Sequence, residues 1–313
     1  MTITLVFDIS LAVLLVAVGI WIVAARHVFT AIVIFVIYGL LLAIVWVQLS
    51  AVDLALTETA IGSGLTGAVL IGAAARLRTS ERAAAEGPSK GLRLAAALLS
   101  ATVAAALATA VLSLPDPAPT LAPAAAANAV ATGFGNPVTN VLVAFRAMDT
   151  LLEKVVLLLA LIGVWSLAPD RLWGEHPVPT RPADPGGTLV FAARLLPPVG
   201  VGVALFILWV GADHPGGAFQ AGAILAAMWL LVLMAGLSEV PPLSHRRLRL
   251  ILIAGPLVFL VVGLGGLWIG SAFLAYPITF AKLLILAIES AMTLTVAATL
   301  GLLAGAPEWS AER

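Results

Sequence analysis

The chain has 313 residues, of which 62% are hydrophobic and only 10% charged, with no net charge and a mean hydropathy of +1.12. This composition excludes a soluble domain. It predicts an all-α polytopic membrane protein, because the apolar runs continue over about 20 residues rather than alternating as in a β-barrel. Cysteine is absent, which excludes disulfides and cysteine-ligated iron–sulfur clusters, and no basic stripe suits nucleic acid.

Nine stretches are apolar and long enough to cross about 30 Å of hydrocarbon as helices. The first lacks the basic region and cleavage site of a signal peptide, so we expect it to remain as a span. In chain order the predicted spans cover residues 4–24, 28–49, 54–75, 92–114, 147–168, 190–211, 217–237, 248–270 and 278–304.

The positions of the basic residues predict the orientation. With the N-terminus outside, all but three of the 16 Lys and Arg residues fall in or beside the predicted cytoplasmic segments. The exceptions, Arg146, Lys154 and Lys282, lie within or beside spans. Because cytoplasmic loops are rich in Lys and Arg, we expect an inner (plasma) membrane protein with its N-terminus outside and its C-terminus in the cytoplasm.

Two polar segments are predicted to divide the chain. Residues 115–137 are rich in Pro and Ala and are expected to form an extended outer loop. Residues 169–189 are polar and Pro-rich and are expected to form a cytoplasmic linker between a five-span half and a four-span half. The predicted regions are residues 1–114, 115–168, 169–189 and 190–305.

Ionisable side chains inside predicted spans are the main functional signal. A charge near the bilayer centre costs roughly 2.5–3.5 kcal/mol on insertion scales, so such groups persist when they pair, line a wet path or carry ions. We predict that they form an ion or proton relay, and structural ion pairs are the alternative for individual members. The six residues are Glu58, Asp149, Glu153, Lys154, Lys282 and Glu289.

The first motif opens the third span. Asp53 is expected at the outer interface, where the dipole of a helix N-terminus favours an acid. Glu58 lies five residues further along, beside the hydroxyl of Thr57. Gly62 and Gly64 permit a close helix contact, a kink or a π-bulge. The motif indicates a relay station, or else a small-residue packing face with a buried acid.

The second motif begins the fifth span. At helical spacing Arg146, Asp149 and Glu153 share one face. An Arg146–Asp149 pair is predicted to neutralise the start of the helix and to leave Glu153 as the titratable group facing inward. Lys154 is expected to point about 100° away, toward another partner.

The third motif, Gly211–Gly222, contains a Pro-Gly-Gly turn and predicts a structural hairpin on the outer side. Asp213 and His214 are its candidate ion mouth. In the last span Lys282 and Glu289 share one face about 10 Å apart along the helix axis. That spacing suits two stations on a hydrated path, or two separate interhelical pairs.

These motifs resemble those of known membrane complexes. Asp53–Gly67 resembles MbhD, a small subunit of membrane-bound hydrogenases that also occurs near the C-terminus of the A subunit of Mrp-type cation/proton antiporters. Asn140–Glu153 resembles the adjoining MbhE piece, and Gly211–Gly222 with the last span resembles MnhB, the Mrp B subunit. The chain departs from these patterns at Ala144, Ala147, Leu152, Ala218 and Ala221.

The resemblance implies a fusion in the order MbhD–MbhE–MnhB, whose first half is similar to the complex I subunit ND6/NuoJ. It implies a transporter subunit rather than an enzyme, without cofactor or bound metal, in a multisubunit Na⁺/H⁺ antiporter. The implied partners are large antiporter-like subunits, a small NuoK-like subunit, lipid, protons and Na⁺ or another cation. Two alternatives stay open: the same subunit in a redox-driven complex, such as a membrane-bound hydrogenase or a complex I-like machine, or a non-conducting scaffold.

Overall fold

The structure is a computed structural model that describes residues 2–77, 89–115, 117, 119–167, 187–242, 244–270 and 272–304. These residues form helices and turns without a strand, which confirms the predicted all-α class. Within them the long helices are α1 (Thr2–Ala24), α2 (Val28–Gln48), the continuous segment α3–η1–α4 (Val52–Thr57, Glu58–Leu65, Thr66–Leu77), α5 (Lys90–Leu112), α8 (Ala147–Ser166), α9 (Thr188–Val210), α10 (Ala218–Met234), α11 (Arg246–Ile269) and α12 (Ala281–Ala304).

Each predicted span corresponds to one of these long segments. Seven of them are long and apolar enough to cross a membrane. The other two are α10, which has 17 residues, and α8, whose first two turns contain Asp149, Glu153 and Lys154. The described chain is therefore consistent with about nine membrane helices.

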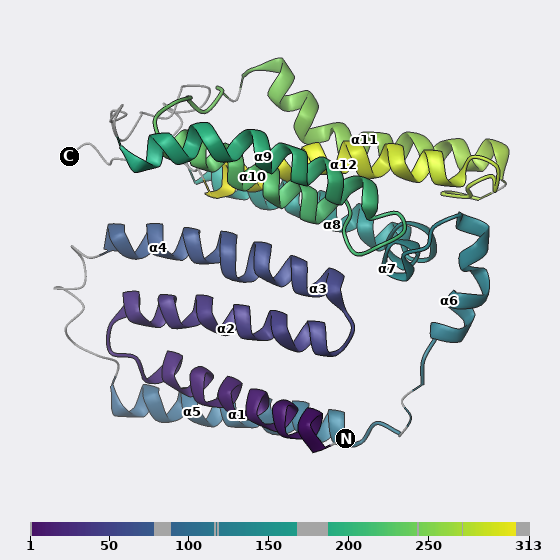
Figure 1. The fold of residues 1–313 in the computed structure, drawn as a ribbon. Helices are drawn as coiled ribbons and strands as arrows, with labels where there is room; N and C mark the ends of the chain where they lie inside the picture. The colour runs from purple at the N-terminus through teal and green to yellow at the C-terminus, as the bar shows by residue number, and fades with distance from the viewer. Residues whose placement is uncertain are drawn as a thin grey trace.

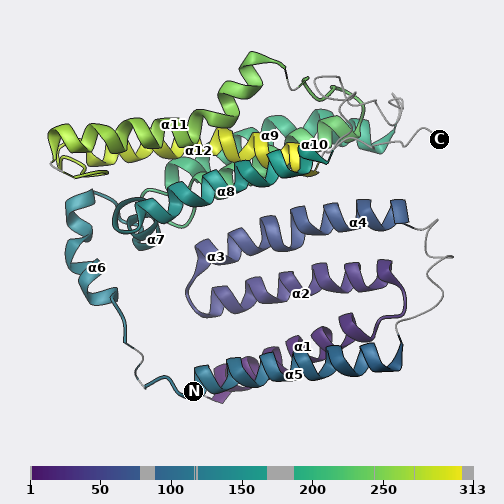
Figure 2. The same ribbon diagram turned by 180° about the vertical axis from the view of Figure 1, so that it is seen from behind.

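The helices form two groups that lie side by side (Figures 1 and 2). Helices α8 to α12 pack together, and the most extensive contacts are those of α10 with α9 and α12 and of α11 with α12. Helices α1, α2 and α3–η1–α4 form a row, and α10 joins the groups by packing against α3 and η1. No residue of α5 is buried in the described chain, so this apolar helix is surrounded by lipid or by other proteins in a membrane.

The most deeply buried core belongs to the second group. Phe259, Ile285, Ile288 and Val296 are completely buried there, whereas large apolar side chains of α1 are widely exposed. Because lipid tails are as apolar as leucine, exposed side chains of this kind carry no hydrophobic penalty inside a bilayer. The tightly packed core of the second group and the exposed apolar side chains of the first therefore suit a membrane protein. Lipid or other subunits cover the exposed apolar surface in such a protein.

Of the kink and the π-bulge that the glycines of the first motif permit, the structure has the π-helical form. Residues Glu58–Leu65 form a π-helix between α3 and α4, and a second π-helix, η3, covers Val141–Phe145. Both motifs that carry acidic residues in the first half thus contain a widened turn. Such turns are uncommon and frequently lie at functional sites.

The expectation of an extended segment at residues 115–137 is wrong for much of its length. It contains α6 (Ala122–Asn128) and the 3₁₀ helix η2 (Ala129–Thr132), followed by the start of α7 (Pro137–Asn140). Alanine has the highest helix propensity, and the proline in the first turn of α6 is tolerated there. Most of the predicted linker 169–189 lies outside the described residues, which resume at residue 187.

Candidate functional site

Four segments bring polar side chains together at one end of the helices, the end predicted to face outside. They are the first turn of α3, α7 with the chain before it, the turn between α9 and α10 with the first turn of α10, and the start of α12 (Figure 1). The buried polar residues of this cluster come from both helix groups. They include Asp53, Asn136, Thr139, Asn140 and Gln220.

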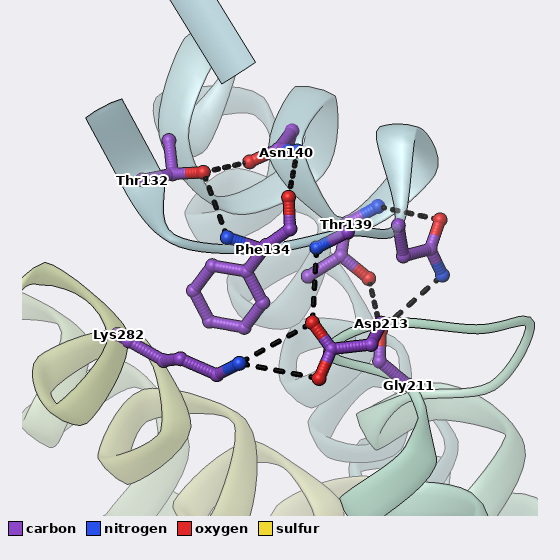
Figure 3. A network of polar contacts seen from close by, with 9 residues as sticks. Thr132, Phe134, Thr139, Asn140, Gly211, Asp213 and Lys282 are labelled. Atoms are coloured by element: carbon purple, nitrogen blue, oxygen red, sulfur yellow. Dashed lines mark hydrogen bonds and ion pairs between the residues drawn. The ribbon is translucent and has the colours of Figure 1, made fainter. Parts of the chain in front are cut away.

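Asp213 and Lys282 form an ion pair at the exposed edge of this cluster (Figure 3). Nζ of Lys282 lies 3.3 Å from Oδ1 and 3.2 Å from Oδ2 of Asp213, and the Gly135 N–H donates to Oδ1 at 3.0 Å. The Gly135 N–H and the Lys282 ammonium together lower the pKa of the Asp213 carboxyl below its ordinary value. The predicted ion mouth is thus a salt-bridged junction of three segments.

Asn136 connects the chain before α7 to the α9–α10 turn. Its amide nitrogen donates to the carbonyls of Gly211 (3.2 Å) and His214 (2.9 Å), while its Oδ1 caps α7 by accepting from the N–H of Val138. Thr139 also donates to the Gly211 carbonyl, at 2.7 Å (Figure 3). In these contacts His214 takes part through its backbone carbonyl.

Asn140 holds the segment before α7 in place from the other side. Its amide donates to the Phe134 carbonyl at 3.1 Å, and Thr132 donates to its Oδ1 (Figure 3). The Phe134 ring lies under the Lys282 ammonium, 5.5 Å from centroid to Nζ, a geometry that favours a cation. The backbone of residues 134–136, which precedes α7, is therefore held by side chains rather than by a regular element.

Asp53 is buried and contacts both helix groups. Its Oδ1 accepts from the Gly216 N–H at 2.8 Å and from the Asn136 amide at 3.4 Å. The prediction of an acid at the start of a helix is confirmed, since Asp53 lies in the first turn of α3. Its role extends beyond the helix dipole, because it accepts hydrogen bonds from two segments remote in sequence.

Glu289 lies deeper, on α12, and its side chain is only 4% exposed. Its Oε2 has no hydrogen-bond partner among the residues that the structure describes. A methyl group on Gly217 would lie 3.5 Å from Oε1 of Glu289 and 3.6 Å from Oε1 of Gln220, so both side chains reach the same glycine. Gln220 in turn donates to the Asp53 carbonyl (3.2 Å) and to Oγ1 of Thr57 (3.1 Å).

Glu58 begins the π-helix and is half-buried against α2. Its carboxylate folds back over Gly62, where a methyl group would overlap it, and Oε1 would lie 3.2 Å from a methyl group on Gly39. A methyl group on Gly64 would lie near the Thr59 carbonyl and near no side chain of the described residues. Of the two predicted glycines, Gly62 is thus the one that makes room for the acid.

The second motif is arranged differently from its prediction. Arg146 pairs with Asp149 as expected, and Arg146, Asp149 and Glu153 share one face. That face points outward, with the Glu153 side chain 61% exposed, so the prediction that Glu153 faces inward is wrong for the described chain. Lys154 is the buried member: its Nζ lies 3.9 Å from Oε2 of Glu153 and 4.6 Å from the Phe219 ring centroid.

The reason lies in how α8 packs. Its buried residues, Ala147, Thr150, Leu151, Lys154 and Leu161, follow a three- to four-residue spacing toward α11 and α12. Lys154 falls on this stripe and Glu153 does not. Sequence reasoning also left out Asn136 and Gln220 as site residues. An amide before a proline and a lone glutamine in an apolar helix were the available signals for them.

Comparisons with known proteins agree with these two groups. A family model for MbhD, the D subunit of MBH, matches residues 13–79, and one described as "Domain related to MnhB subunit of Na+/H+ antiporter" matches residues 188–305. A chain of the Mrp complex from Dietzia sp. DQ12-45-1b is similar over 97% of this chain and 35% of that one, with 26% identity and a TM-score of 0.74.

Two further proteins are similar to parts of this chain. A chain of the membrane-bound sulfane sulfur reductase, an archaeal respiratory membrane complex, is similar over 67% of this chain and 94% of that one, with 25% identity and a TM-score of 0.53. The uncharacterized protein MJ1307 of Methanocaldococcus jannaschii is 31% identical over 166 residues, 44% of this chain and 59% of the relative. The chain thus spans less than two thirds of both the Mrp chain and MJ1307.

The order of the two matched parts confirms the predicted arrangement. The chain is an Mrp-type fusion in which an MbhD-like part precedes an MnhB-like part. Residues 140–153 lie between the matched ranges, and their likeness to MbhE stays a prediction.

Proposed function

We propose that this Mrp-type fusion is a membrane subunit of a multisubunit monovalent cation/proton antiporter, in which buried carboxylates transfer protons or cations. The observation that carries the proposal is Glu289. Its carboxylate is 4% exposed, and Oε2 makes no hydrogen bond in the described chain. Burying such a group in a membrane protein costs free energy unless the group binds a partner reversibly. A transported cation or proton is such a partner.

A polar connection between the two parts supports this role. Gln220 reaches the glycine beside Glu289 on one side and bonds Thr57 and the Asp53 backbone on the other. Glu58 follows Thr57 directly in the π-helix. Gln220 of the MnhB-like part thus bonds the segment that carries Asp53 and Glu58 and lies near the same glycine as Glu289, a placement that suits lateral ion transfer from one part to the other.

Lys154 is the third element of the proposed relay. It is a buried amine on α8 above the Phe219 ring, next to the helix turn that also carries Gln220. Asp149 and Glu153 lie on the outward face of α8. In the proposed complex these exposed acids contact lipid headgroups or another subunit. From the outward face of α8 they contribute to the path of the transferred ions.

Substitutions in the co-expressed complex test the proposal. Glu58→Ala and Glu289→Gln are expected to abolish Na⁺-driven proton movement in everted vesicles while the complex still assembles, and Asp8→Asn on α1 serves as the matched acid control. Assembly is read from co-purification of the other subunits. Normal exchange in both variants would refute the relay and favour the scaffold.

A second candidate function has an observation of its own in its favour, the likeness to the sulfane sulfur reductase chain. In that case the same acids serve an ion pump driven by electron transfer in other subunits. A pull-down of the tagged chain in mild detergent separates the two. Antiporter-like subunits without iron–sulfur proteins would favour the antiporter, and co-purifying iron–sulfur subunits would favour the redox-driven complex.

A further inference from the structure

Two buried carboxylates lie against neighbouring glycines of the α9–α10 turn, residues Gly211–Gly217. The Gly216 N–H donates to Oδ1 of Asp53 at 2.8 Å. A methyl group on Gly217 would lie 3.5 Å from Oε1 of Glu289. The two glycines have φ values of 153° and 121°, which residues with a side chain rarely adopt. The turn therefore presents bare backbone to both acids.

The other side of the same turn faces outward. Residues 213–215 are exposed, whereas the two glycines that follow them are buried. On the exposed side Asp213 pairs with Lys282 (Figure 3). Lys282 lies seven residues before Glu289 on α12, and this spacing places both on one face of the helix. The turn thus separates an exposed ion pair from two buried acids.

The direction of α12 brings Glu289 to the turn. Side chains of a helix lean toward its N-terminus, and α12 begins at the end predicted to face outside. Further along the helix sides, Ile285 and Ile288 are completely buried among the packed helices. Water or an ion that approaches Glu289 from the outer end therefore meets the turn first.

The contacts that hold the turn differ along its length. At its start, the Gly211 carbonyl accepts hydrogen bonds from Asn136 and Thr139, both of which are buried. In its middle, Asp213 is held by Lys282, and both side chains of this pair are about half exposed. An exposed ion pair contributes little stability, and water can replace it. The start of the turn is therefore an anchor, and its middle can be released.

We propose that the α9–α10 turn is a lid over Glu289, closed in this structure, which opens to connect this carboxylate with the outer side. The inference rests on the proposed function and adds to it the place where ions or protons enter or leave the MnhB-like part. Opening breaks the contacts of the turn with Lys282 and Asp53. It also breaks the hydrogen bond from Asn136 to the His214 carbonyl.

A disulfide at the edge of the lid tests whether it must move. The chain contains no cysteine, and a methyl group on Gly135 would lie 3.3 Å from Cα of Asp213, within reach of a disulfide between these positions. In liposomes with the reconstituted complex, oxidation of the Gly135→Cys/Asp213→Cys protein should lower its exchange rate about tenfold or more, and a reductant should restore it. An unchanged rate with the disulfide formed overturns the lid.

A second disulfide provides the matched control. A methyl group on Gly67 of α4 would lie 3.9 Å from Cβ of Val36 on α2, a suitable distance for a disulfide. Both positions belong to the first helix group. The oxidised Val36→Cys/Gly67→Cys protein should keep the exchange rate of its reduced form. Equal losses in the two oxidised proteins would mean that cross-linking in general stops exchange, and would count against the lid.

Thiol labelling gives a readout that does not depend on transport. Glu289→Cys in the purified complex should react slowly with a charged, water-soluble maleimide. Adding Lys282→Glu places like charges at the edge of the lid and should speed the reaction about fivefold or more. Adding Asp213→Lys as well restores an opposite-charge pair and should slow it again. Ile288→Cys, in the packed core, should stay slow throughout. Equal rates of Glu289→Cys in all three backgrounds overturn the lid.

The outcomes separate the lid from the proposed function. Loss of exchange in Glu289→Gln together with full exchange in the disulfide-linked protein would keep the relay and remove only the lid. Normal exchange in both Glu58→Ala and Glu289→Gln would refute the relay and with it the part of the lid in transport. If the reduced Gly135→Cys/Asp213→Cys protein cannot exchange, the labelling rates decide the question.

Discussion

Lys282 and Asp213 form an ion pair, with Nζ 3.2 Å from Oδ2, that joins the first turn of α12 to the turn between α9 and α10. The Gly135 N–H donates to the same carboxylate, so the pair also holds the chain that leads into α7. Both side chains are about half exposed. An exposed pair of this kind contributes little stability by itself, but here it orients three segments above the buried Asp53.

Asp213 makes stability depend on pH in a defined direction. Its pKa in the folded protein lies below the ordinary value of 3.8 because Gly135 and Lys282 favour the charged form. The unfolded chain therefore binds a proton at higher pH, so the stabilisation is present above about pH 4 and is lost as the pH falls through the lowered pKa.

We expect thermal midpoints of the wild-type protein to decrease below about pH 4 by more than those of Asp213→Asn. The comparison is measured in detergent at fixed ionic strength, with Asp8→Asn as the exposed-acid control. Equal pH dependence in the wild type and Asp213→Asn would contradict the assignment.

Asn136→Ala removes the cap of α7 and two hydrogen bonds to the α9–α10 turn. Because the partners are buried, we expect a loss of about 2–4 kcal/mol of unfolding free energy. Among the residues that the structure describes, the exposed Asn128 on α6 bonds the carbonyl four residues before it and no other group. Asn128→Ala should therefore change the thermal midpoint much less, and similar losses in the two variants would argue against Asn136 as a connector.

Lys154→Met tests whether the buried amine serves stability or transport. Methionine replaces the stem without the charge, and removing a buried charge with a weak partner often leaves stability equal or higher. We expect an unchanged or raised thermal midpoint together with impaired ion exchange. Glu153→Gln, on the exposed partner, should alter stability by less than about 1 kcal/mol. Full exchange in Lys154→Met would exclude this lysine from the path.

Gly222→Ala tests the close contact of α10 with α12. The added methyl group would lie 2.7 Å from Cγ1 of Val296 and 3.0 Å from the Thr293 carbonyl, so the helices must separate. We expect a destabilisation of about 1–3 kcal/mol. At Gly265 of α11 a methyl group meets no atom within 4 Å, and Gly265→Ala should be close to neutral. A stable Gly222→Ala protein would show that this interface tolerates expansion.

Much of the helix arrangement could be predicted because it depends on local properties. Continuous apolar runs predicted the nine long helices, and the three-residue spacing of Arg146 and Asp149 predicted their pair. The glycines after Glu58 allowed a kink or a π-bulge, and the structure has a π-helix there. The segment at 115–137 failed because its prolines were weighed above its alanines. The inward direction of Glu153 failed because spacing alone does not say which face of a helix packs against its neighbours.

The sequence by itself determined the class of protein, the approximate spans, the motifs and their order, since hydropathy and helical periodicity act over a few turns of one helix. The tertiary structure decided which of these residues meet. Asp53 accepts from the Gly216 N–H, 163 residues away, and Ser63 and Glu58 converge on Gly39 of another helix. Such contacts depend on the packing of whole helices, and no spacing along a single helix encodes them.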